Sequence, residues 1–147
     1  MKQRFNMPDE MPESYKAMYA FSRSMDNLKV LSKIQKELIK IRASQINGCA
    51  FCLNMHSTDA RKLGETEQRI YLLNAWRETP LYTEEERALL ALTEEVTLVS
   101  QKGLTEATYQ EAVKHFGVQG TAEIVMAVTV INAWNRIAIA SLLPPAL

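Results

Sequence analysis

Glycine and proline are scarce in this sequence, with five of each in 147 residues, and cysteine occurs only twice. No charge sign is in excess, because 17 basic and 17 acidic residues give a formal net charge of zero. A basic surface for nucleic acid or for an anionic membrane is therefore not expected. The chain is 47% hydrophobic and 23% charged. This composition predicts one globular domain, residues 1–147, large enough to fold without a disulfide.

The start of the sequence lacks the apolar segment of a signal peptide, which predicts a cytoplasmic protein. Thiols stay reduced in that compartment, so paired cysteines there are more often catalytic or metal-binding than structural. The most apolar stretch, residues 122–143, contains Glu123, Asn132, Asn135 and Arg136. That polarity argues against a membrane span.

The hydrophobic pattern predicts helices and no strands, because no alternating pattern of useful length occurs. Thr83 and Glu86 form a capping box, and Thr105 begins a helix that Gly117 ends. We therefore expect an all-α bundle of six or seven helices. The predicted helices span residues 13–24, 28–45, 49–64, 66–77, 84–100, 105–116 and 121–142.

The last predicted helix, residues 121–142, carries hydrophobic residues on most of its sides. Such a helix lies either at the centre of the core or against another subunit. We expect a homo-oligomer for this reason. Within the same helix, Asn132 and Arg136 lie one turn apart and could face a site or an interface.

The two cysteines, Cys49 and Cys52, are separated by two residues, and His56 follows four positions later. On a helix these three side chains point to one side. Both cysteines fall in the predicted first turn, where free backbone N–H groups and the helix dipole favour a thiolate. His56 could move a proton to or from Cys52. The cluster therefore predicts a reactive dithiol.

Two other interpretations of this motif remain open. Cysteine often serves as a small buried hydrophobic residue, so the pair could be purely structural. Alternatively, Cys49, Cys52 and His56 could bind zinc together with a carboxylate, although three ligands within two helical turns strain a tetrahedral site.

Glu37 lies at the margin of the hydrophobic face of its predicted helix, near Ile34 and Ile41. A carboxylate bordering a core is costly unless it is paired, and it could accept a proton from a nearby thiol. The alternative is an ordinary ion pair with Lys33 or Lys40 on the same helix. The sequence leaves both interpretations open.

Taken together, the spacing Glu37-x11-Cys49-x2-Cys52-x3-His56 resembles the signature of the alkylhydroperoxidase D (AhpD-like) branch of the carboxymuconolactone decarboxylase superfamily. The Ala-Trp-Asn-Arg segment, residues 133–136, is similar to the last helix of that family. The resemblance implies an all-helical domain that assembles into trimers or hexamers, while the apolar last helix alone also allows a dimer. It further implies a peroxidase that uses thiols and needs no metal or flavin.

Within this resemblance, Cys52 attacks an organic peroxide or hydrogen peroxide, and Cys49 is the resolving partner. Glu37 accepts a proton from Cys49, and His56 completes the proton relay. An external dithiol or a thiol protein would then reduce the resulting disulfide. In thioredoxin-like motifs, by contrast, the first cysteine is the nucleophile, as helix-dipole arguments also favour.

One residue departs from the family pattern, because Phe51 stands where the prototype has a second histidine. This difference bears on how well the proton relay works. Two other functions remain possible: a thiol–disulfide oxidoreductase or redox sensor with little peroxidase activity, and a structural or metal-binding helical module.

Overall fold

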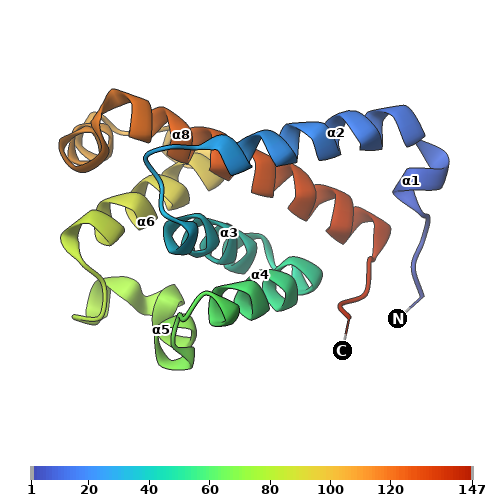
Figure 1. The fold of residues 1–147 in the computed structure, drawn as a ribbon, viewed down its shortest axis with the longest axis horizontal. Coiled ribbons are helices and arrows are strands. Elements are labelled where there is room, and N and C mark those ends of the chain that lie inside the picture. The colour runs from blue at the N-terminus through green and yellow to red at the C-terminus, as the bar shows by residue number, and fades with distance from the viewer. Residues whose placement is uncertain (1, 147) are drawn as a thin grey trace.

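The computed structural model describes residues 2–146, and helices account for all the regular secondary structure of this part of the chain (Figure 1). The all-α prediction is confirmed, although the described residues form eight α-helices rather than the six or seven expected. Two of the helices are single turns, and 3₁₀ turns cover Met25–Asn27 and Leu73–Glu78. The α-helices are α1 (Met7–Glu10), α2 (Pro12–Ser24), α3 (Lys33–Asn47), α4 (Ala50–Lys62), α5 (Glu67–Leu72), α6 (Glu84–Thr97), α7 (Val99–Lys102) and α8 (Glu106–Ser141).

The core lies where α3, α6 and α8 pack together, with α4 against α3. Fully buried aliphatic side chains from all three central helices meet there, and each stabilises the fold by about 1.5–3 kcal/mol relative to its exposed state. By contrast, α2 buries none of its residues and lies across the outside of the bundle (Figure 1). The fully buried aliphatic residues of the core include Leu38, Ile39, Ile41, Leu89, Leu90, Leu92, Ile124 and Val128.

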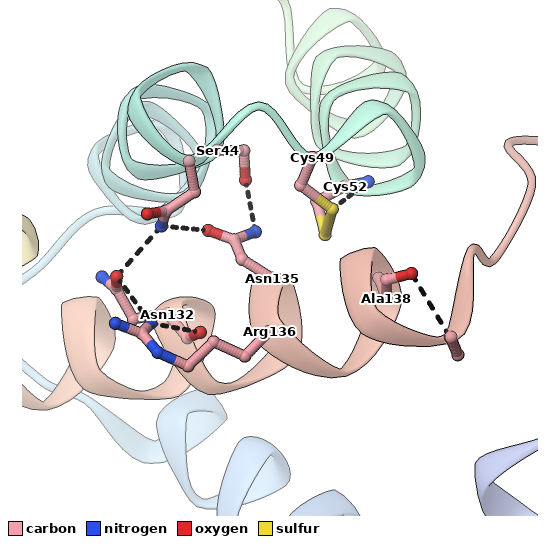
Figure 2. Close-up of a disulfide and its surroundings, with 9 residues drawn as sticks. Ser44, Cys49, Cys52, Asn132, Asn135, Arg136 and Ala138 are labelled. Carbon is pink, nitrogen blue, oxygen red and sulfur yellow. Dashed lines mark hydrogen bonds between the residues drawn. A yellow bond between two sulfur atoms is a disulfide. The ribbon is translucent and has the colours of Figure 1, made fainter.

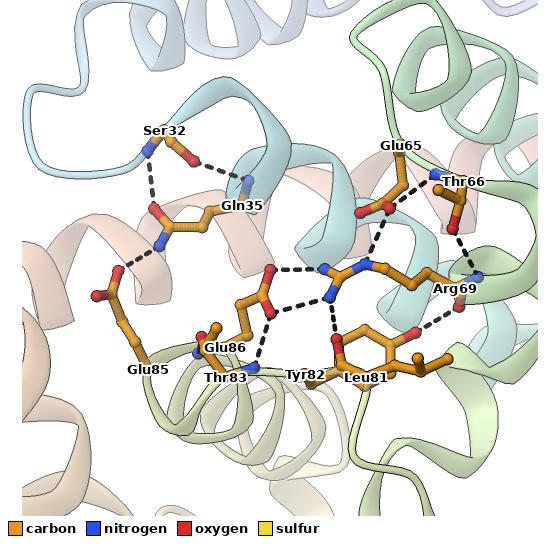
Figure 3. A network of polar contacts seen from close by, with 10 residues as sticks. All are labelled: Ser32, Gln35, Glu65, Thr66, Arg69, Leu81, Tyr82, Thr83, Glu85 and Glu86. Atoms are coloured by element: carbon orange, nitrogen blue, oxygen red, sulfur yellow. Dashed lines mark hydrogen bonds and ion pairs between the residues drawn. The ribbon is translucent and has the colours of Figure 1, made fainter.

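The helix ends follow local sequence signals. Ser32 and Gln35 form a capping box at the start of α3, and the predicted box of Thr83 and Glu86 begins α6. Gly48 ends α3 in the left-handed conformation (φ 71°, ψ 35°), which glycine adopts at little cost. Polar contacts near these caps tie α5 to α6, because the Arg69 guanidinium bonds Glu86 at 2.6 Å and also Glu65 (Figure 3).

The predicted helix 28–45 begins later than expected, at Lys33. The backbone N–H groups of Lys29, Val30 and Leu31 instead donate to the buried carboxylate of Glu123 on α8, at 3.0, 3.0 and 3.2 Å. A side chain that is distant in sequence thus satisfies three buried or partly buried backbone donors of this segment, which precedes the helix. Leu31 is still buried, so the hydrophobic face was predicted correctly although part of it is not helical.

The predicted helices 105–116 and 121–142 are the two parts of α8, joined across Gly117. Gly117 has φ 66° and ψ 176°, a conformation that L-residues with a side chain rarely adopt. Three residues later, a Cβ atom on Gly120 would lie 2.7 Å from Val30 Cγ1, so only glycine leaves room for that side chain. The two glycines thereby shape α8 where residues 29–31 cross it.

Two other boundaries also differ from the prediction. The region 66–77 is split between α5 and the 3₁₀ turn Leu73–Glu78, which contains the non-helical residue Ala75. The helix predicted over 84–100 ends at Thr97, and α7 follows as a separate turn.

Helix α8 is long and apolar enough to cross a membrane by length and composition alone. Half of its most apolar window is buried, however, and Glu123 and Asn135 are both buried with polar partners inside the bundle. These features are those of the central helix of a folded bundle.

Candidate active site

The paired cysteines lie at the start of α4, directly after the turn at Gly48. Cys49 is the N-cap of α4, and its Sγ accepts a hydrogen bond from the Cys52 N–H at 3.3 Å. The Cys49 N–H donates to the Ser44 carbonyl of α3 at 3.0 Å. The two cysteines are joined as a disulfide, and both are buried (Figure 2). The predicted position of the dithiol at a helix N-terminus is therefore confirmed.

His56 lies one turn after Cys52 on α4 and is buried. Its Nδ1 is 2.9 Å from Oε2 of Glu37, which comes from α3 and is also buried. The second carboxylate oxygen of Glu37, Oε1, accepts a hydrogen bond from Lys40 Nζ at 2.7 Å. The predicted ion pair with Lys40 is therefore present, and Glu37 also pairs with the imidazole, while its role as acceptor of a thiol proton stays a prediction. Among residues 2–146, it forms no hydrogen bond with either sulfur.

Glu37 is held in its ionised form. Burial alone would raise its pKa, but the hydrogen bond from His56 and the charge of Lys40 outweigh burial and lower the pKa below the usual value. An ionised carboxylate only accepts hydrogen bonds, so the proton between the two groups resides on His56 Nδ1. The other ring nitrogen, Nε2, then remains available to exchange a proton elsewhere in the site.

A cavity of about 330 Å³ opens beside this cluster, between α2 and the helices beneath it. Cys52 and His56 both line the cavity, whereas Cys49 and Glu37 are not among its lining residues. Phe51, the residue that departs from the family pattern, is also part of the wall. The remaining lining is mainly aromatic and aliphatic and includes Tyr15, Tyr19, Met25, Leu28, Met55, Val130, Ile131, Trp134 and Ile137.

A buried amide network lies on the other side of the disulfide (Figure 2). The Asn47 side-chain amide donates to Asn132 Oδ1 at 3.0 Å and to Asn135 Oδ1 at 2.8 Å, and Asn135 donates to Ser44 Oγ at 3.0 Å. Arg136 adds a hydrogen bond to Asn132 Oδ1. The network ties the end of α3 to α8, immediately before the cysteines. The sequence signal was the run of polar residues within an apolar helix, but it did not reveal Asn47 and Ser44 as their partners.

The structure gives no independent sign of a metal centre. Within residues 2–146, no group of three or more His, Cys, Asp and Glu side chains is arranged to hold a metal ion. Cys49 and Cys52 are bonded to each other, and His56 is bonded to Glu37. The arrangement supports proton transfer and thiol chemistry through residues of the chain itself.

Comparison with known sequences gives a family match over much of the chain. The model of the carboxymuconolactone decarboxylase family matches residues 12–95, a region that contains Glu37, both cysteines and His56. The uncharacterised protein YdfG of Bacillus subtilis (strain 168) is 43% identical over 140 residues, which is 95% of each chain.

Solved structures extend this similarity to the whole fold. A protein of unknown function from Agrobacterium tumefaciens, described as a candidate antioxidant defence protein AhpD, has a TM-score of 0.95. It is 38% identical, and the match covers 99% of both chains. The debrominase Bmp8 superposes with a TM-score of 0.83 at 20% identity, over 94% of this chain and 74% of that one. At that identity, the similarity to Bmp8 is one of fold alone.

Proposed function

Because this chain belongs to the carboxymuconolactone decarboxylase family and has the AhpD-like fold, we propose that it is a thiol-dependent peroxidase. One fold can host different reactions, as the debrominase shows, so the proposal depends on the site. The observation that carries it is the pairing of Glu37 with His56 beside a cavity that Cys52 lines and Cys49 does not. The site thus offers a sulfur in the cavity wall, a second sulfur bonded to it and a buried proton acceptor.

In the first step, the Cys52 thiolate attacks the terminal oxygen of a peroxide in the cavity. A sulfur–oxygen bond forms while the oxygen–oxygen bond breaks, so Cys52 is oxidised to a sulfenic acid and the peroxide is reduced. The leaving alkoxide takes a proton from His56 Nε2 and departs as an alcohol, or as water when the substrate is hydrogen peroxide. Before this transfer the His56 imidazole carries a positive charge, which the ionised Glu37 stabilises.

In the second step, Cys49 displaces the hydroxyl group from Cys52. The Cys49 thiol gives its proton to the His56–Glu37 pair, its sulfur bonds to the Cys52 sulfur, and hydroxide leaves as water after taking that proton. One peroxide and two thiols are thus converted to one alcohol, one water and the disulfide. The Cys49–Cys52 bond of the structure corresponds to this product.

An external dithiol or a thiol protein completes the cycle. Its thiolate attacks the Cys52 sulfur, which lines the cavity, and Cys49 leaves as a thiolate. The helix-cap position suits Cys49 for that departure, because the Cys52 N–H and the N-terminus of α4 stabilise negative charge on its Sγ. The helix dipole, which favours a thiolate at the first cysteine, therefore supports Cys49 as the leaving group. The position of Cys52 in the cavity wall supports Cys52 as the attacking sulfur.

Peroxide consumption by the reduced protein in the presence of a dithiol tests the proposal. Cys52→Ser should abolish turnover. Cys49→Ser should still consume one equivalent of peroxide and accumulate the Cys52 sulfenic acid, which a dimedone adduct reports by mass spectrometry. Full turnover by Cys52→Ser, or the absence of a dimedone adduct on Cys52 in Cys49→Ser, would overturn the assignment of roles.

The same preparation separates the other two functions. A thiol–disulfide oxidoreductase would exchange disulfides with a small dithiol at a useful rate but would consume little peroxide. A metal-binding module would carry stoichiometric zinc after purification without chelators, and the peroxidase proposal predicts none.

We also propose that the protein functions as a homo-oligomer in which α8 contacts a second copy. Val118, Ala122, Met126 and Thr129 follow one another at helical spacing on the exposed face of α8, and Val118 and Met126 are 66% and 40% exposed. An exposed apolar stripe on a helix usually marks a surface that another protein chain covers. Light scattering should show Met126→Glu with a lower mass than the wild type, and an unchanged mass would exclude this face.

A further inference from the structure

The cavity beside Cys52 contains a lysine without an acidic partner. Lys36 on α3 is half-buried and lines the cavity, and its Nζ donates to the neutral Met25 carbonyl at 3.1 Å. Among residues 2–146, it takes part in none of the ion pairs. Lys40, one turn further along α3, also lines the cavity, but its charge is neutralised by Glu37 at 2.7 Å. Lys36 is thus the cation that remains available to a ligand.

One acidic residue, Asp26, also lines the cavity. It is exposed and lies beyond ion-pair distance from Lys36 within the described chain, so water screens its charge well. Lys36, in contrast, is partly removed from water beside apolar walls, where an unpaired charge is costly and a bound anion relieves that cost. Charge complementarity therefore favours an anionic group at Lys36.

The rest of the cavity suits an apolar body. Tyr15 of α2 packs edge-on against Trp134 of α8, with ring centroids 5.5 Å apart, and both rings line the cavity. The volume of about 330 Å³ is within the range of small-molecule sites, roughly 300–1,000 Å³. Lys36 lies about one helical turn, roughly 6 Å along α3, before Lys40, and Lys40 adjoins the Glu37–His56 pair. An anionic group at Lys36 therefore lies about one helical turn from Lys40, the lysine that pairs with Glu37.

We propose that the cavity binds amphipathic carboxylic acids, with the carboxylate on Lys36 and the hydrocarbon chain against the aromatic wall. This proposal rests on the proposed peroxidase function, and with it the substrates are hydroperoxides of fatty acids. The carboxylate of such a molecule is held by Lys36, and its hydroperoxide group lies at Cys52 in the wall of the same cavity. Small peroxides have no carboxylate to contact Lys36, so Lys36 does not increase their affinity.

A binding experiment on a form that does not turn over tests the ligand class by itself. Decanoate and decan-1-ol are titrated into Cys52→Ser protein, and the change in fluorescence of Trp134 is followed. Lys36→Met should weaken decanoate binding by about 10-fold, the worth of one charge-assisted hydrogen bond, and should leave decanol binding in place. Lys33→Met is the matched control, since Lys33 lies on the same helix but is exposed and outside the cavity lining.

The charge argument also predicts an opposite effect. Asp26→Asn removes the acidic residue of the lining and should tighten decanoate binding about twofold, with decanol unaffected. Trp134→Phe should abolish the fluorescence response, which confirms that the signal comes from the cavity. Unchanged decanoate affinity in Lys36→Met, or equal weakening by Lys33→Met, would overturn the proposal.

Steady-state kinetics on protein that retains Cys52 test whether molecules of this ligand class are also substrates. The ratio of kcat/KM for linoleic acid hydroperoxide to that for its methyl ester should fall by about 10-fold in Lys36→Met. An unchanged ratio would contradict the substrate assignment. If decanoate binds through Lys36 but no peroxide of any kind is consumed, the peroxidase function is wrong while the ligand class stands.

Discussion

Glu37 on α3 and His56 on α4 are joined by a hydrogen bond of 2.9 Å between Oε2 and Nδ1, and both side chains are buried. The two residues lie 19 positions apart on different helices. Their contact determines which nitrogen of His56 carries a proton and leaves the other nitrogen for the thiol chemistry. In the proposed reaction this carboxylate–imidazole pair carries the protons of the two thiols.

Substitution of Glu37 by glutamine should separate its chemical role from its structural one. Glutamine keeps the shape and one hydrogen-bonding oxygen but loses the charge, so the protein should fold while peroxide turnover falls by about 10-fold or more. Lys40→Met is the control, because it removes the second partner of Glu37 and leaves the imidazole pair intact. Glu37→Gln turnover equal to that of the wild type would return Glu37 to a purely structural ion pair.

Removal of the Glu123 carboxylate should release residues 29–31 from α8. Glu123→Ala leaves three backbone N–H groups without their acceptor and should destabilise the fold by about 2–4 kcal/mol. Hydrogen exchange at Lys29, Val30 and Leu31 should accelerate more than exchange in the core of α6. Gln119→Ala preserves the three bonds and serves as the control. Unaltered exchange at these amides would show that other contacts hold the segment.

The break in α8 should not tolerate a side chain. Gly117→Ala places a Cβ at φ 66° and ψ 176° and should lower the free energy of unfolding by about 1–3 kcal/mol, measured by urea denaturation. Val118→Ala, at the neighbouring exposed position, should change it by less than about 0.5 kcal/mol. Equal stability of Gly117→Ala and the wild type would mean that the helix can be rebuilt without the break.

The buried amide network should couple Asn135 to Ser44. Asn135→Ala leaves Ser44 Oγ and the Asn47 amide short of a partner and should cost about 1–3 kcal/mol. In the double variant with Ser44→Ala the losses should be less than additive, because the two groups share one bond. Strict additivity in denaturation would show that this hydrogen bond contributes nothing to stability.

Acid should destabilise the protein partly through Glu95. The backbone N–H of Thr105, which the carboxylate accepts at 2.8 Å, and bonds from Thr108 and Lys102 outweigh the opposing effect of burial and lower the pKa of Glu95 from 4.5 to about 2. A depressed pKa in the folded state stabilises the protein above pH 4.5, and this contribution is lost as the pH falls towards about 2.

The free energy of unfolding should therefore decrease with falling pH across this interval, and the decrease should be smaller in Glu95→Gln. At neutral pH the same variant should be less stable than the wild type by about 1–3 kcal/mol. Glu84→Gln, which alters an exposed residue of the same helix, should follow the wild-type profile. Coinciding profiles for Glu95→Gln and the wild type would contradict the assignment.

Much of the helical organisation could be predicted from the sequence, since helix ends depend on residues only a few positions apart. The capping box of Thr83 and Glu86, the stop at Gly48 and the placement of Cys49 at the start of α4 all follow from such local chemistry. The predictions failed where a distant group fixes the backbone. Residues 28–32 have a helical hydrophobic pattern, but Glu123, nearly a hundred positions away, accepts hydrogen bonds from the N–H groups of residues 29–31 and holds them outside the helix.

In the candidate site, too, some features followed from the local sequence and others only from the tertiary structure. Local spacing on one helix determined that the two sulfurs and the imidazole share one side of α4. Only the packing of α3 against α4 decided that Glu37 reaches His56, and only the position of α2 over α8 created the cavity that Cys52 lines. The physical reason is range: turns, caps and helix faces arise within a few residues, whereas a buried ion pair and a cavity exist only where separate helices meet.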